Sequence, residues 1–137
     1  MKKNGFTLIE AVLALVLLAG GLLGIMTLFQ RNVSNANVME QTLKATFLAQ
    51  ERMEQIILDK KYKLYPFIVS ANYPTSENLT AQGFPGYTRT IQILEVDSNN
   101  LSSASNGSGY KRITVAVSVS GGDTVTLTTL LTKWGEP

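Results

Sequence analysis

The sequence predicts an α+β protein in which one long N-terminal helix packs on a C-terminal antiparallel sheet of three to four strands. Three observations support this prediction: an uninterrupted apolar block near the N-terminus, an amphipathic stretch after it, and segments of alternating polarity beyond residue 86. At 137 residues the chain has room for one small domain and one long element, and not for two independent cores.

The apolar block runs from residue 6 to residue 29 as FTLIEAVLALVLLAGGLLGIMTLF. As a helix it would be about 36 Å long, enough to cross a bilayer core of roughly 30 Å. Lys2 and Lys3 precede it, and the next basic residue is Arg31. Because positive charges favour the cytoplasmic side, we expect the N-terminus inside and the rest of the chain outside. The block therefore predicts a single-pass membrane segment.

Two ordinary interpretations of this block leave features unexplained. A secretory signal would end at a small-residue cleavage site, a role into which Ala19-Gly20-Gly21 would have to be forced. A plain membrane anchor would not contain Glu10, since a charge within the apolar run costs on the order of 2.5–3.5 kcal/mol on insertion scales.

A third interpretation comes from the string Gly5-Phe6-Thr7-Leu8-Ile9-Glu10, which follows a short basic leader. It resembles the prepilin cleavage and methylation motif shared by type IV pilins, type II secretion pseudopilins and related filament proteins. The resemblance implies that a membrane prepilin peptidase removes residues 1–5, cuts between Gly5 and Phe6, and methylates the new Phe6 amine. The apolar segment would then be kept.

The chemistry of this string can be argued from its residues. Gly5 has no side chain and a permissive backbone, so an extended scissile peptide can enter a protease cleft. Cleavage would create a positive amine at Phe6, about 6 Å of helical rise from Glu10. A neighbouring subunit displaced by one turn could present its amine to Glu10, which assigns Glu10 and Phe6 to assembly. The alternative is that Glu10 reaches the lipid headgroups from a shallow depth.

Beyond residue 29 the apolar residues recur near helical spacing, which predicts an amphipathic helix to about residue 60. Glu40 and Lys44 are placed for an i,i+4 ion pair, and residues 31–37 are the weakest part because Asn and Ser compete with helical hydrogen bonds. We expect four apolar side chains to form core beneath the sheet: Phe47, Leu48, Ile56 and Ile57.

The head, residues 30–137, continues with an irregular connection at 62–86 that contains a short strand near 67–69, followed by a sheet within 87–134. Alternating polarity predicts strands at 87–96, 111–119 and 124–133. A polar loop joins the first two, and a tight turn at 120–123 joins the last two. This order of helix and antiparallel strands also resembles minor pilins and minor pseudopilins.

Composition argues against several function classes. The chain has no Cys and no His, and no carboxylate pair in a recognisable motif, so we expect no enzyme, no cofactor and no metal site. Without Lys2 and Lys3, the 12 basic residues become 10 and equal the 10 acidic ones, which argues against a nucleic-acid-binding surface.

The resemblance implies a structural subunit of a type IV pilus-like filament, a minor pilin or minor pseudopilin. It would be stored in the inner membrane and later belong to a periplasmic or extracellular filament. The implied partners are other subunits, the prepilin peptidase, the inner-membrane assembly platform and the lipid bilayer.

Two alternatives remain open from the residues. One is a membrane-anchored or filament-tip adhesin or DNA-uptake module that binds through the segments 62–85 and 97–109. Aromatic side chains that could serve such a module are Tyr65, Phe67, Tyr73 and Tyr87. The other is an anchored enzyme. The residues do not distinguish a pilus from a secretion or competence system.

Overall fold

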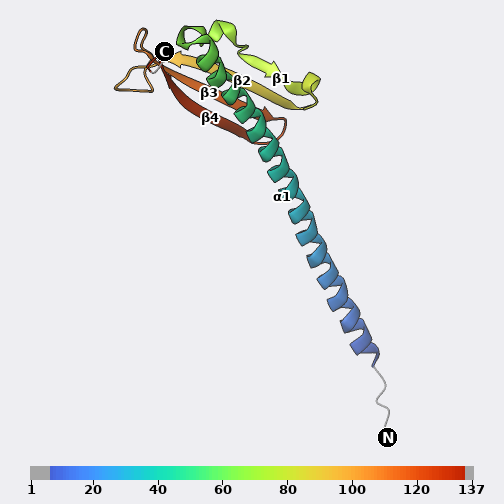
Figure 1. Ribbon diagram of the computed structural model, residues 1–137. Coiled ribbons are helices and arrows are strands. Elements are labelled where there is room, and N and C mark those ends of the chain that lie inside the picture. Colours follow the sequence, from blue (N-terminus) through green and yellow to red (C-terminus); the bar gives the residue numbers. More distant parts are fainter. Residues whose placement is uncertain (1–6, 135–137) are drawn as a thin grey trace. The chain divides into compact units, whose positions relative to one another are not determined.

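The computed structural model describes residues 7–134, which form one long helix, three short 3₁₀ helices and four strands (Figure 1). The helix α1 spans Leu8–Lys63. The 3₁₀ helices are η1 (Tyr65–Phe67), η2 (Ser70–Asn72) and η3 (Leu79–Gln82), and the strands are β1 (Ser76–Asn78), β2 (Tyr87–Glu95), β3 (Tyr110–Val119) and β4 (Thr124–Thr132). The chain divides into two compact units after Met39.

The first unit is helical from Leu8 onward, and all of its described side chains, from Thr7 to Met39, are exposed. The stretch 31–37, which the sequence marks as the weakest part of the helix, is helical throughout. Its four Asn and Ser residues are therefore tolerated at this place, where their side chains point away from any packed surface.

The second unit contains a four-stranded antiparallel sheet in the order β1-β2-β3-β4. The predicted fold class is confirmed, and each of the three long strands agrees with its predicted bounds to within one residue. The turn between β3 and β4 contains Gly121 with φ of 78°, a left-handed conformation that glycine adopts without strain. Beside it, a Cβ on Gly122 would lie 2.4 Å from Val119 Cγ1, so this position has no room for a side chain.

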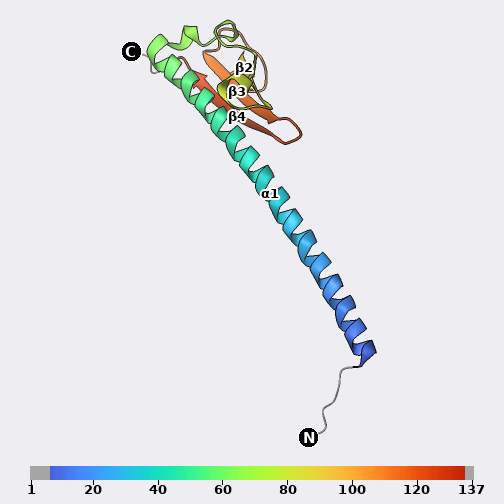
Figure 2. The same cartoon turned by 90° about the vertical axis from the view of Figure 1, so that its right-hand side faces the viewer.

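The C-terminal part of α1 lies along one face of this sheet, as Figures 1 and 2 both show, and the core lies between the two. Residues at i, i+3 and i+4 spacing bury one helix face, and Ala45 and Ala49 have 0% exposure, so their small side chains let the helix approach the strands closely. The buried residues of this cluster include Leu48, Met53 and Ile56 from α1 and Ile91, Ile113, Val115, Val117 and Leu131 from the sheet.

Two predictions about the core are wrong. Leu48 and Ile56 are buried as expected, but Phe47 and Ile57 are 61% and 43% exposed. Both lie one residue outside the buried stripe of the helix, at about 100° from a core position, and so face away from the sheet.

The predicted strand near 67–69 is also wrong. Residues 65–67 form η1 with Pro66 in its first turn, where a missing N–H and a fixed φ suit a helical start. The additional short strand lies at Ser76–Asn78 instead, where it pairs antiparallel with β2. Before η1, α1 ends as Leu64 takes φ of 68°, which redirects the chain after the basic last turn.

Candidate functional site

Glu10, the predicted assembly residue, lies in the first turn of α1. The Glu10 backbone N–H donates to Thr7 Oγ1 at 3.4 Å, and the Thr7 hydroxyl donates to Glu10 Oε2 at 3.4 Å. The bond from the Glu10 N–H to the Thr7 hydroxyl is the N-cap half of a capping box, and the Glu10 carboxylate accepts from the Thr7 hydroxyl. Glu10 therefore has a local partner within its own helix. The predicted processing residues, Gly5 and Phe6, lie outside the described residues.

The helix surface that follows Glu10 is apolar and exposed. Side chains such as Leu13, Leu17 and Leu23 are 59%, 68% and 67% exposed, although each is large and aliphatic. An exposed apolar surface of this extent marks a lipid- or protein-binding surface. By length and composition α1 can cross a membrane. The Thr27 hydroxyl donates to the Gly24 carbonyl at 2.8 Å, so its polar atoms are satisfied within the helix.

Three glycines leave a hollow on this surface. A Cβ added at Gly20, Gly21 or Gly24 would meet no described atom within 4 Å. The adjoining depression has a volume of about 310 Å³ and is lined by Leu17, Leu18, Gly21, Leu22 and Ile25. Such a notch lets a second apolar helix approach closely.

In the second unit, charged side chains gather beneath β1. The Arg89 side chain is 3% exposed, and its Nε donates to Glu77 Oε2 at 2.6 Å while its Nη1 donates to the Leu48 carbonyl at 3.0 Å. Arg52 of α1 binds the other oxygen of Glu77, and Glu51 Oε2 lies 3.2 Å from Arg89 Nη1. The cluster joins α1, β1 and β2, and its groups are ion-paired rather than free for chemistry. The sequence did not predict it, because its members are spread over nearly forty positions.

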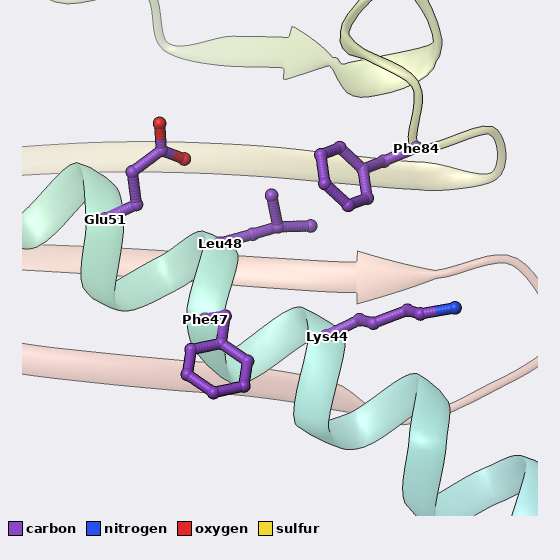
Figure 3. Close-up of a pocket in the computed structure, with 5 residues that line it drawn as sticks. All are labelled: Lys44, Phe47, Leu48, Glu51 and Phe84. Carbon is purple, nitrogen blue, oxygen red and sulfur yellow. The ribbon is translucent and has the colours of Figure 1, made fainter.

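A groove of about 490 Å³ lies beside this cluster and is lined by Lys44, Phe47, Leu48, Glu51 and Phe84 (Figure 3). Leu48 extends from the helix toward Phe84, which comes from the loop before β2, with Lys44 and Glu51 on either side. The predicted ion pair is confirmed: Lys44 Nζ donates to Glu40 Oε1 at 2.6 Å, and this hydrogen bond lowers the pKa of Glu40. The groove therefore presents apolar and aromatic surface between charged groups that already have partners.

The four aromatic side chains proposed for a binding module are buried or partly buried rather than exposed for binding. Tyr65, Tyr73 and Tyr87 are buried, and Phe67 is partly buried against the core. The loop after β2 is organised locally, since Asp97 Oδ1 accepts hydrogen bonds from the backbone N–H groups of Asn99 and Asn100. Among residues 7–134, no group of three or more acidic side chains converges as a metal site would require.

Comparison of the chain with family models, curated proteins and solved structures found no match. A function for this chain therefore has to be inferred from its residues and from where the fold places them.

Proposed function

We propose that this chain is a structural subunit of a type IV pilus-like filament, a minor pilin or minor pseudopilin. The observation that carries the proposal is the apolar stretch of α1 up to Phe29, exposed on every side, whose only charge is Glu10 in the first turn, four residues after Phe6. A helix with this surface needs lipid or other apolar helices around it.

The proposed sequence of events begins in the inner membrane, with the N-terminus in the cytoplasm. The prepilin peptidase cuts between Gly5 and Phe6 and methylates the Phe6 amine. The assembly platform then draws the subunit out of the bilayer, and lipid contacts are exchanged for contacts between helices. Apolar surface remains out of water throughout, so the hydrophobic free energy is kept.

Glu10 sets the register between subunits in this proposal. A carboxylate in an apolar fibre core is costly unless it has a partner of opposite charge. The positive Phe6 amine of a neighbour supplies one. Thr7 and Glu10 are hydrogen-bonded within the isolated subunit, so pairing with a neighbour would exchange a local contact for a stronger charged one.

Processing is tested by the intact mass of the native protein. We expect loss of residues 1–5 and one added methyl group at Phe6. An uncut chain, or one cut near Gly21, would refute the assignment. A Gly5→Leu variant should remain uncut, because its side chain obstructs the extended peptide in the protease cleft.

The role of Glu10 is tested by comparing two variants for incorporation into sheared filaments. Glu10→Ala should insert into the membrane normally and be incorporated at least tenfold less. Thr7→Ala removes the capping contact and keeps the carboxylate, so it should be incorporated nearly as well as the unmodified chain. If both variants fail equally, Glu10 acts as a helix cap and the pairing role is wrong.

The groove at Phe47 favours a second candidate function, a binding module carried on the membrane or at a filament tip. Phe47 is 61% exposed, lines the groove together with Phe84, and forms no part of the core cluster. Phe47→Ser should then abolish adhesion or DNA uptake without changing the number of filaments. Leu43→Ser, at a residue that is 55% exposed and lies one turn earlier, is the matched control.

A further inference from the structure

The two edges of the sheet differ in how they are protected. At one edge, β1 has three residues, begins two residues after Pro74 and runs directly into η3. Short edge strands and nearby prolines prevent pairing with other chains. At the other edge, β4 has nine residues, Thr124–Thr132, with the sequence TVTLTTLLT. It contains no charge, proline or glycine.

The outward backbone groups of β4 can be identified from its register. Lys133 N–H donates to the Gly109 carbonyl at 3.0 Å, so this residue faces β3. Residues alternate in an antiparallel ladder, and the odd-numbered residues of β4 therefore bond to β3. Five residues direct their N–H and C=O groups to the free edge: Thr124, Thr126, Thr128, Leu130 and Thr132. β3 bonds the odd-numbered residues, and within residues 7–134 no backbone bond outside the strand ladders reaches these five.

The apolar layer beneath β4 is also incomplete. On β3, the inward residues Ile113, Val115 and Val117 have 0% exposure. On β4, the inward residues Val125 and Leu127 are partly buried against the same cluster. A strand added beside β4 would cover them and continue the sheet.

We propose that two copies of this chain pair through β4, antiparallel about a two-fold axis at Thr128. In this register all nine residues of β4 pair with the other copy, and the numbers of two facing residues always add up to 256. Thr128 meets its twin, and Val125 meets Leu131 of the other copy, so inward residues remain inward. All five outward residues obtain partners for both backbone groups.

Charge complementarity supports a second copy as the occupant. Asp123 and Lys133 flank β4 on either side. In the register of full overlap, Asp123 of each copy lies opposite Lys133 of the other, at both ends of the paired strands. No like charges meet between them. Opposite charges across strands stabilise a pair, and like charges oppose it.

The two-fold symmetry restricts where two copies can pair through β4. A two-fold axis normal to the sheet makes the helical segments 40–63 of the two copies antiparallel. Subunits that enter one fibre from one membrane run parallel. The β4 pair would therefore form between subunits outside a fibre. The inference does not depend on the proposed filament function.

The register is tested by disulfide trapping in the full-length chain, in detergent and in isolated membranes. The protein has no cysteine of its own, so any crosslink comes from the introduced one. In Thr128→Cys the two Cα atoms would be about 5.5 Å apart, within the range that a disulfide spans. In Thr126→Cys the twins would be offset by about 13 Å along the strand. Oxidation with diamide should crosslink only Thr128→Cys.

Three outcomes of this experiment would overturn the proposal. They are the absence of a Thr128→Cys dimer, equal crosslinking of both variants, and crosslinking of Thr128→Cys to a different protein. The last outcome would instead indicate a partner strand from another chain.

Charge variants test the same pair without cysteine. Thr128→Lys opposes two like charges at the two-fold axis and should weaken self-association about tenfold. Thr90→Lys makes the same change on β2, away from the edge, and should have no effect. Asp123→Lys should weaken the pair, and adding Lys133→Asp should restore it. If neither Thr128→Lys nor Asp123→Lys weakens self-association, the contact lies elsewhere, for example at the glycine notch, and the β4 pair is refuted.

Discussion

Arg89 has the lowest exposure of the charged side chains in the described part of the chain, at 3%, and is held by three acceptors on two elements, α1 and β1. Glu77 supplies an acceptor from β1, the Leu48 carbonyl one from α1, and Glu51 a third. A buried guanidinium is tolerated because its donors are matched in geometry and charge. This cluster holds the three-residue strand β1 against both the helix and β2.

We expect Glu77→Ala to destabilise the second unit by about 3 kcal/mol, because Arg89 and Arg52 would lose their shared buried partner. The free energy of unfolding from urea denaturation measures this effect. Glu40→Ala is the control, since it removes an exposed ion pair within α1 and should leave the denaturation midpoint unchanged. Equal losses of unfolding free energy in both variants would mean that the buried cluster stabilises the unit no more than an exposed ion pair does.

At the scale of elements, the connection between α1 and β2 is held to the end of the helix by Tyr73. Its hydroxyl donates to Asp59 Oδ2 at 2.8 Å, and Lys63 Nζ lies 2.8 Å from Asp59 Oδ1. The hydrogen bond from Lys63, aided by the one from Tyr73, lowers the pKa of Asp59. Burial, together with the Asp59 carboxylate, raises the pKa of Tyr73.

These two pKa shifts predict that the contributions of Tyr73 and Asp59 to the free energy of unfolding depend on pH in opposite directions. The Tyr73 pKa is higher in the folded state than in the unfolded state, so its contribution is fully present below about pH 10 and is lost as pH rises above that value. The difference in unfolding free energy between the unmodified chain and Tyr73→Phe should therefore be constant from pH 7 to 9 and decrease above pH 10. A difference that stays constant up to pH 11 would contradict this assignment. The Asp59 contribution should instead be lost in acid, below its ordinary pKa near 3.8.

At the scale of the whole molecule, the division after Met39 separates two kinds of surface. Residues 7–39 contribute exposed side chains and none of the buried core. The core cluster begins at Ala45 and includes buried residues of all three long strands. The part of the chain that needs an apolar environment is therefore not the part that folds around the sheet.

A fragment that starts at Asn35 should consequently be soluble without detergent and fold cooperatively. Its circular dichroism should show both helix and sheet, and its unfolding midpoint should match that of the second unit in the full chain. The full chain should need detergent or lipid to remain in solution. An unfolded or aggregated fragment would show that residues before Asn35 contribute to folding.

Much of this fold could be predicted from local patterns. The alternation of polar and apolar residues predicted β2, β3 and β4, because one face of each strand is buried. The spacing of Glu40 and Lys44 predicted their ion pair, since i,i+4 residues are neighbours on any helix. The strand near 67–69 was misassigned, because apolar character alone does not separate a strand from a buried 3₁₀ turn at Pro66.

Local patterns in the chain were enough to predict an α+β architecture, an apolar helical stretch with one acidic residue near its start, and a hairpin turn at residues 120–123. These features depend on near neighbours along the chain. The folded structure was needed to find that Phe47 is exposed, that Arg89 pairs with Glu77 and Glu51, and that β4 is the open edge of the sheet. Each of these depends on which distant segments lie side by side, and burial and strand order follow from that packing rather than from any local pattern.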